Sequence, residues 1–341
     1  MRKCKGIVTG FVIFLVISAM VSTLTACTGK KEASLSGKAH ATYTLKMSTQ
    51  LAETSTMVGG FKAWAEAVKQ RTNGGLIIEV YTAAQLGSDE DVIEQALQGA
   101  NVAVLTDGGR MANYVKDIGI IGMAYIANDY NELKRITETK TFKSWDEALI
   151  KENIKILSYN WYDGPRNFYT NKVIRVPADL NGIRIRTPGS PVWSRSVASL
   201  GATPFAMPWN ESYDALQNKV IDGVEVQSTS AYPNGIYELT KYMTRTEHFQ
   251  LANFVMCGEI WFETLPADYQ KILVDECKRA SVVNATQILA AAEKFEKLMV
   301  NNGLTINQVD KAPFIAAAEK AYDELDFKTL RDKIWAEIGK K

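Results

Sequence analysis

The sequence predicts an α/β fold of two lobes, built from mixed, mostly parallel sheets and one long helix that spans both lobes. Short apolar runs alternate along the chain with segments of helical period, which is typical of strand–helix–strand units. The 341 residues exceed the roughly 250–300 at which a single core usually splits. Residues 267–301 contain neither proline nor glycine. At about 1.5 Å per residue this helix would be roughly 50 Å long, which is more than the width of one lobe.

The amino terminus predicts export from the cytoplasm. Three basic residues precede an apolar run at residues 7–21: Arg2, Lys3 and Lys5. A charged region followed by a short apolar region is typical of a secretory signal peptide, which we assign to residues 1–26. The rest of the chain would then lie outside the cytoplasm, at the outer face of the cytoplasmic membrane or in the periplasm.

Cys27 follows Leu24-Thr25-Ala26, a segment that resembles the processing site of bacterial lipoproteins. We therefore expect Cys27 to carry a lipid anchor. Residues 27–41 have no apolar period and are predicted to form a flexible tether. The alternative is an uncleaved membrane anchor, because residues 7–26 approach the ~20 residues that span a bilayer.

The remaining elements follow in order along the chain. Strands are predicted at residues 43–47, 76–81, 101–105, 154–161 and 251–262, and helices at 56–70, 89–98, 131–152, 267–301, 314–325 and 328–339. Ser88 and Asp91 have the spacing of a capping box at the start of the second helix.

Charge and composition exclude several classes of protein. Lys and Arg total 39 against 38 for Asp and Glu, and removal of the three basic residues of the leader takes the formal charge from +1 to 1 − 3 = −2. This balance argues against a nucleic-acid partner. The two histidines are His40 and His248, and His40 lies in the predicted tether, so multi-histidine metal sites and most Ser-His arrangements are excluded.

No glycine-rich phosphate loop, dinucleotide fingerprint or nucleophile elbow occurs in the sequence. We therefore expect no catalytic residues, no cofactor and no metal site. The alternative is acid–base catalysis by Asp222 and Glu225. Cys257 and Cys277 could form a disulfide or remain buried free thiols.

One arginine is placed where a ligand would bind. Ile183 and Ile185 alternate with Arg184 and Arg186, so one face of this strand belongs to the core and the other carries guanidinium groups. Pro188 cannot continue a central strand, which puts Arg186 near the carboxyl end, where open α/β sheets bind ligands. A guanidinium can hold a carboxylate through two parallel hydrogen bonds. The alternative is a weak surface ion pair.

Several spaced segments together resemble the dicarboxylate-type solute-binding subunits of TRAP transporters. They are Gln85-Leu86-Gly87, Trp161 to Lys172, Asn181 to Pro188, Leu200 to Pro204, Met207 to Gln217, Asp222 to Glu225 and Thr246 to His248. The resemblance covers residue 43 to the end. It implies a periplasmic-binding-protein-like fold, with residues 42–163 and 252–291 in lobe I and residues 164–251 and 292–341 in lobe II. It also implies an organic acid held between the lobes and delivered to TRAP membrane permease subunits.

The resemblance adds a second arginine, because the family has an arginine at the position of Arg166 that orients the ligand carboxylate. Arg166 and Arg186 are thus predicted to form a two-arginine clamp. The alternative for Arg166 is an ion pair with Asp163 or another nearby acid. Further ligand-binding residues are predicted, with core packing as the alternative for the aromatic ones: Trp161, Tyr162, Trp209, Tyr213, Glu225 and Gln227.

Val226 departs from the family, which often has an asparagine directly after the glutamate. Either Gln227 substitutes for that asparagine or the ligand is less polar at that end, which favours a monocarboxylate with an apolar or aromatic body. A C4-dicarboxylate or sugar-acid receptor of the same family and a ligand-binding sensor lipoprotein are the alternatives. We expect a monomer, with dimerisation through the helix at residues 267–301 as the alternative.

Overall fold

The computed structural model of the protein describes residues 42–340. The predicted signal peptide, the tether and Cys27 lie outside these residues. The described residues belong to one compact unit. Within the described part of the chain, no helix has the length and apolar character needed to cross a membrane.

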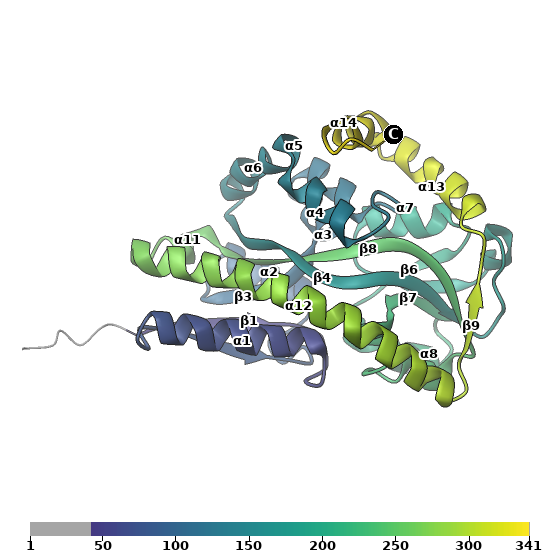
Figure 1. Cartoon of the computed structure of the whole chain (residues 1–341), viewed down its shortest axis with the longest axis horizontal. Helices are drawn as coiled ribbons and strands as arrows, with labels where there is room; N and C mark the ends of the chain where they lie inside the picture. The colour runs from purple at the N-terminus through teal and green to yellow at the C-terminus, as the bar shows by residue number, and fades with distance from the viewer. Residues whose placement is uncertain (1–41, 341) are drawn as a thin grey trace, which may run out of the picture. The chain divides into compact units, whose positions relative to one another are not determined.

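A mixed sheet of nine strands forms the centre of the described chain (Figure 1). The strands are β1 (Tyr43–Ser48), β2 (Leu76–Tyr81), β3 (Val102–Asp107), β4 (Ile154–Thr170), β5 (Arg184–Thr187), β6 (Thr203–Ala206), β7 (Gly223–Gln227), β8 (Tyr242–Gly258) and β9 (Thr305–Gln308). Their spatial order is β2-β1-β3-β8-β4-β7-β5-β6, with β9 beside β8. The predicted α/β class with a mixed sheet is confirmed, although the strands form one continuous sheet.

The sheet has two parallel groups joined by antiparallel strands. In the first strand group, β1 pairs in parallel with β2 and β3. In the second strand group, β5 pairs in parallel with β6 and β7. The long strands β4 and β8 pair antiparallel with each other, and they join β7 and β3 in antiparallel ladders. The carboxyl ends of both groups therefore meet near the middle of the sheet.

The predicted strands at residues 154–161 and 251–262 were wrong in extent. β4 continues to Thr170 because a register shift between Tyr162 and Gly164 absorbs the glycine, which has a φ of +103°. β8 begins earlier than predicted and ends at Gly258. The next four residues form a short helix, α11 (Glu259–Phe262), in place of the predicted strand.

Helices cover the sheet on both sides. They are α1 (Thr56–Arg71), α2 (Asp89–Leu97), α3 (Gly108–Met111), η1 (Lys116–Gly122), α4 (Tyr130–Glu138), α5 (Lys140–Lys143), α6 (Asp146–Lys151), η2 (Pro177–Leu180), α7 (Pro191–Ser199), η3 (Trp209–Glu211), α8 (Ser212–Gln217), α9 (Ser228–Ala231), α10 (Ile236–Leu239), α12 (Ala267–Asn301), α13 (Ala312–Glu324) and α14 (Lys328–Glu337).

Two predictions about helices had different outcomes. The capping box of α2 is confirmed, since Ser88 Oγ accepts a hydrogen bond from the Asp91 amide (3.2 Å) and Asp91 Oδ2 accepts one from the Ser88 amide (2.9 Å). The single helix predicted at residues 131–152 was wrong, because it consists of α4, α5 and α6. Thr139 has an extended backbone and caps α5 through its side chain, which ends α4.

The predicted long helix is confirmed as α12, which runs along the sheet in Figure 1 and packs against α1, β4 and α9. Downstream of it, α13 packs on α7, whereas α14 reaches elements of the predicted lobe I. Arg135 donates to the carbonyl oxygen of Ile338 (2.7 Å), and Trp335 Nε1 donates to that of Ile126 (2.9 Å). The lobe boundaries therefore stay a prediction.

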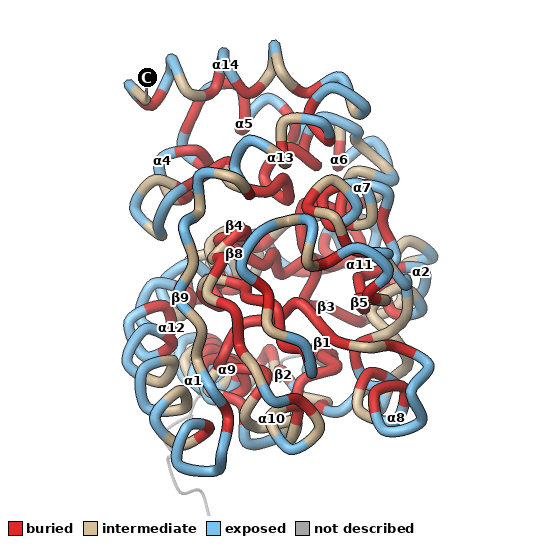
Figure 2. The backbone as a smooth tube through the Cα atoms, turned by 90° about the vertical axis from the view of Figure 1, so that its right-hand side faces the viewer, coloured by how far each residue is buried: buried red, intermediate tan, exposed pale blue. Residues whose placement is uncertain are grey.

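The central strands β3, β4, β7 and β8 are the most buried part of the described chain, whereas β6, β9 and the outer faces of the helices are more exposed (Figure 2). The larger hydrophobic cluster surrounds the first strand group, α1 and α12. A smaller cluster contains Ile185, Trp193 and Phe314 and lies beside the second strand group. Cys257 and Cys277 are both buried free thiols, and burial raises the pKa of each.

Adjacent glycines of α1 provide a test of the packing against α12. A Cβ atom added at Gly60 would lie 2.6 Å from Asn284 Nδ2 and 2.9 Å from Trp161 Cζ3, whereas one added at Gly59 would meet nothing within 4 Å. Gly60→Ala is therefore expected to destabilise the fold by about 1–3 kcal/mol through overpacking. Gly59→Ala should be neutral or stabilise by up to ~1 kcal/mol through helix propensity. Chemical denaturation of both variants measures this, and equal stabilities would contradict the close approach of α12.

Candidate functional site

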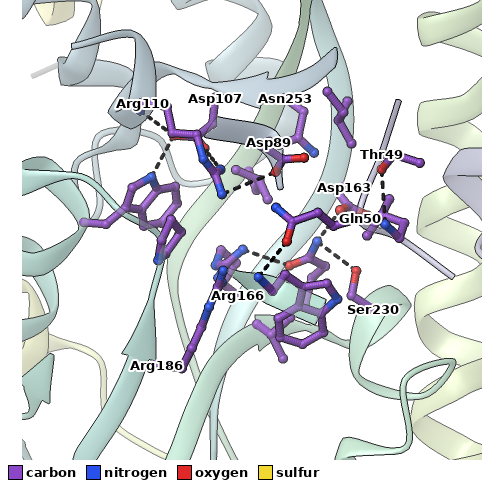
Figure 3. Close-up of a pocket in the computed structure, with 18 residues that line it drawn as sticks. Thr49, Gln50, Asp89, Asp107, Arg110, Asp163, Arg166, Arg186, Ser230 and Asn253 are labelled. Carbon is purple, nitrogen blue, oxygen red and sulfur yellow. Dashed lines mark hydrogen bonds and ion pairs between the residues drawn. The ribbon is translucent and has the colours of Figure 1, made fainter. Parts of the chain in front are cut away.

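Residues at the carboxyl ends of β1, β3, β5 and β7 surround one cavity of about 60 Å³ (Figure 3). This is the position at which open α/β sheets bind ligands. Its lining residues are Thr49, Gln50, Leu51, Asp89, Leu105, Asp107, Arg110, Asp163, Arg166, Arg186, Pro188, Trp193, Trp209, Val226, Gln227, Ser230, Leu251 and Asn253. Both strand groups and both long strands contribute to the site.

Arg186 lies in β5 and is only 3% exposed. Its Nε donates to the carbonyl oxygen of Met207 (3.0 Å), but Nη2 has no hydrogen-bond partner among the described residues. The guanidinium carbon lies 5.4 Å from the centre of the Trp209 ring. Burial, followed by the positive charges of Arg110 and Arg166, lowers the pKa of Arg186 to about 9. Arg186 is therefore a buried cation whose charge is not balanced by an ion pair within residues 42–340.

Arg166, in β4, has an acidic partner. Its Nε and Nη2 donate to the Glu225 carboxylate over 2.6 Å each, and Nη1 donates to Gln227 Oε1 (3.1 Å). Burial acts to raise the pKa of Glu225, but Arg166 and His248 hold that pKa below its ordinary value. The predicted alternative, an ion pair with Asp163 or another nearby acid, therefore occurs, and the acid is Glu225.

Arg110 follows β3 and has three acidic neighbours. It forms ion pairs with Asp107, with Glu90 (2.7 Å) and with Asp89 (3.3 Å). Trp193 Nε1 also donates to Asp107 Oδ1 (2.7 Å). Burial acts to lower the pKa of Arg110, but these three carboxylates raise it further than burial lowers it. The charge of Arg110 is therefore balanced before any ligand binds.

The carboxyl groups of Asp163 and of Asp89, the most distant acidic partner of Arg110, also face the cavity. Asp163 accepts hydrogen bonds from Thr229 Oγ1 (3.1 Å) and from Gln227 Nε2. Burial raises the pKa of both aspartates to about 6. The cavity thus has one unbalanced cation, Arg186, and several groups that can accept hydrogen bonds.

The structure brings together half of the residues that the sequence analysis proposed as ligand contacts. Those that line the cavity are Arg166, Arg186, Trp209 and Gln227, whereas Glu225 lies behind Arg166. Val226, where the resemblance predicts a departure from the family, also lines the cavity.

Three predicted aromatic contacts lie elsewhere. Trp161 is fully buried, and its Nε1 donates to Cys277 Sγ (3.4 Å). The Tyr162 hydroxyl donates to Gln250 (2.7 Å), and Tyr213 lies on α8, away from the cavity lining. Trp161 and Tyr162 therefore follow the predicted alternative of core packing, because their side chains point away from the cavity.

Sequence reasoning missed several cavity residues, most importantly Gln50, Asp89 and Arg110. Gln50 follows β1, and Arg110 follows β3 by three residues. The argument that placed Arg186 at the carboxyl end of its strand applies equally to these two, so the signal was present in the sequence. Within residues 42–340 no group of three or more His, Cys, Asp or Glu side chains could hold a metal ion.

Comparison with known proteins gives the family. The model of the bacterial extracellular solute-binding protein family 7 (DctP) matches residues 47–329. The sialic acid-binding periplasmic protein SiaP of Vibrio cholerae is 24% identical over 294 residues, which cover 86% of this chain and 91% of that protein.

Two solved structures of TRAP periplasmic solute-binding proteins are also similar. The protein from Ochrobacterium anthropi with bound L-fuconate has a TM-score of 0.85 at 32% identity, covering 87% of this chain and 99% of that one. The protein from Escherichia fergusonii, an apo open structure, has a TM-score of 0.76 at 31% identity, covering 86% and 99%. As its sequence predicted, this chain belongs to the DctP family of TRAP solute-binding proteins.

Proposed function

We propose that this protein is a lipid-anchored receptor outside the cytoplasm that captures a small organic acid and delivers it to a TRAP permease. The observation that carries the proposal is the buried, unbalanced guanidinium of Arg186 in the cavity. A buried charge without a partner is costly, and a carboxylate would remove that cost while forming two parallel hydrogen bonds. An anion is thus the chemical complement of the site.

The two arginines of the predicted clamp have different roles in this proposal. Arg186 uses one of its five N–H donors on Met207 and keeps its terminal nitrogens for the ligand. Arg166 uses four of its five N–H donors, on the carboxylate and the carbonyl oxygen of Glu225 and on Gln227. Arg186 is therefore the main carboxylate contact, and Arg166 is a fixed neighbour that contributes one remaining N–H.

The lining supports a compact hydroxylated acid over an acid with an aromatic body. A cavity of about 60 Å³ accommodates on the order of five water-sized groups. Asp89, Asp163 and Asn253 present oxygen atoms that can accept hydrogen bonds from hydroxyl groups. L-Fuconate, bound by the relative from Ochrobacterium anthropi, is a hydroxylated monocarboxylate, but it has more non-hydrogen atoms than this cavity holds, so its binding would require the two walls to move apart.

Removal of Arg186 tests the main contact. We expect Arg186→Ala to weaken binding of L-fuconate and related sugar acids by about 100-fold or more, because two charge-assisted bonds of about 1.5–3 kcal/mol each are lost. The free protein should keep or gain thermal stability, because the unbalanced buried charge is gone. Calorimetry and thermal melting measure the two effects.

Arg184→Ala is the matched control, because Arg184 lies two residues away and pairs with Asp222 (2.8 Å) without lining the cavity. It should leave affinity unchanged. Wild-type affinity in Arg186→Ala would contradict the proposed contact.

Binding is also expected to depend on pH. The pKa of Asp89 and of Asp163 is raised to about 6 by burial, and a bound anion would raise both values further. Protons are then taken up on binding, so affinity should increase as the pH falls from about 8 towards 5.5, where the ligand carboxylate stays ionised. Calorimetry in buffers of different ionisation enthalpy measures the uptake.

Asp89→Asn should reduce this pH dependence but not abolish it, because Asp163 still titrates near the same pH. An affinity that increases towards high pH would contradict the assignment.

The lipid anchor gives a separate prediction for Cys27. In cells supplied with labelled palmitate, the wild-type protein should be labelled and membrane-bound, because the cysteine thiol is the attachment point. Cys27→Ser should abolish the label, whereas Cys257→Ser should not, because that thiol is buried. Equal labelling of all three proteins would exclude Cys27 as the lipidated residue.

A further inference from the structure

Gln50 connects the two sides of the cavity. It follows β1 in the first strand group and is only 4% exposed. Its Oε1 accepts hydrogen bonds from the backbone amides of Trp209 (2.9 Å) and Asn210 (3.4 Å), which belong to η3 beyond β6 of the second strand group. One side chain therefore spans from one wall of the cavity to the other.

The other end of the same amide has no hydrogen bond of ordinary length. Gln50 Nε2 is buried and unpaired by this measure, but its neighbour is the Asp89 carboxylate, on whose pKa the amide has a lowering effect. In Figure 3 the side chain extends among Asp89, Arg166 and Arg186, within the cavity. The amide NH2 carries two N–H donors, and neither forms a hydrogen bond of ordinary length, so Nε2 can donate to a ligand that enters beside Asp89.

Other bonds between the same walls lack this second function. Ser190 Oγ donates to the carbonyl oxygen of Gly109 (2.6 Å), and Trp193 Nε1 donates to Asp107 (2.7 Å). Neither of these two side chains has a second, unpaired polar atom that faces the cavity. Gln50 alone among these three side chains combines a bond across the cavity with an unused donor inside it.

We propose that Gln50 couples occupation of the cavity to its closure. The ligand accepts a hydrogen bond from Nε2, and the amide group is polarised by this donation. Oε1 then becomes a stronger acceptor for the amides of Trp209 and Asn210, because hydrogen bonds in a chain strengthen one another. The bound acid thereby tightens the contact that holds the second wall.

The identity of the ligand in this proposal rests on the proposed function. The hydrogen bonds of Gln50 across the cavity do not. The protein resembles the L-fuconate-bound relative (TM-score 0.85) more than the apo open one (0.76), at 32% and 31% identity. This difference is consistent with walls that already touch in the structure described here.

Two substitutions separate the two ends of the amide. Gln50→Glu keeps an oxygen acceptor for Trp209 and Asn210 but replaces the donor with a negative charge. Gln50→Met keeps the length of the side chain and removes both functions. Gln217→Glu is the control, because it makes the same charge change at an exposed position of α8.

Amide hydrogen exchange at Trp209 and Asn210 in the ligand-free protein tests the contact across the cavity. Exchange should accelerate about fivefold in Gln50→Met, as expected for the loss of one hydrogen bond, and should stay at the wild-type rate in Gln50→Glu and Gln217→Glu. Equal rates in the wild type and Gln50→Met overturn the proposal, whichever acid is the ligand.

Titration with L-fuconate tests the donor end. Affinity should fall at least about tenfold in both Gln50 variants and stay unchanged in Gln217→Glu. Wild-type affinity in Gln50→Glu overturns the proposal even if Arg186→Ala has lost binding, in which case the proposed function stands. If L-fuconate does not bind the wild type, the proposed ligand is wrong, and the exchange rates alone decide whether Gln50 joins the two walls.

Discussion

The structure of the site depends on one constraint, a buried guanidinium that the described chain does not neutralise. Arg110 and Arg166 line the same cavity, but each is matched by its own carboxylates. Arg186 lines the same cavity but has no carboxylate partner among the described residues. The positive charges of Arg110 and Arg166 make its burial in the charged form less favourable. Arg186 is therefore the unbalanced cation among the described residues that line the cavity, and the proposed function assigns an anionic ligand to it.

The continuous sheet explains how this point comes to lie between two walls. Because β4 and β8 run antiparallel through the centre, they connect two parallel strand groups whose carboxyl ends face one cavity. α12 packs along β4 and fixes the same elements from outside. Movement of one group relative to the other would have to bend two long strands and one long helix, so closure is expected to be a small rotation about these connections. Contacts that cross the cavity, such as that of Gln50, are then the ones that distinguish its open and closed forms.

The sequence predicted the elements that depend on neighbouring residues along the chain. It missed the features that depend on which strands pair and in which register. The uninterrupted length of α12 follows from the absence of proline and glycine, and the start of α2 follows from Ser88 and Asp91. Arg186 was identified from alternation and a following proline. By contrast, the partnership of Arg166 with Glu225 depends on the register of β4 against β7, which residues 59 positions apart do not reveal. The extent of β4 was missed for a related reason, because its Gly-Pro pair is accommodated by register shifts with β8.

The distribution of charge around the cavity also favours some classes of organic acid over others. A ligand with one carboxylate satisfies Arg186 and places its remaining groups beside Asp89 and Asp163, which repel a second negative charge but accept hydrogen bonds from hydroxyl groups. Val226 removes a polar partner on β7, yet Gln227 is already held by Arg166 and Asp163. A dicarboxylate would have to displace one of these internal partners before its second charge was balanced. A monocarboxylate with hydroxyl groups would bind without breaking any of them, and this difference favours it over both the dicarboxylate and the acid with an apolar body.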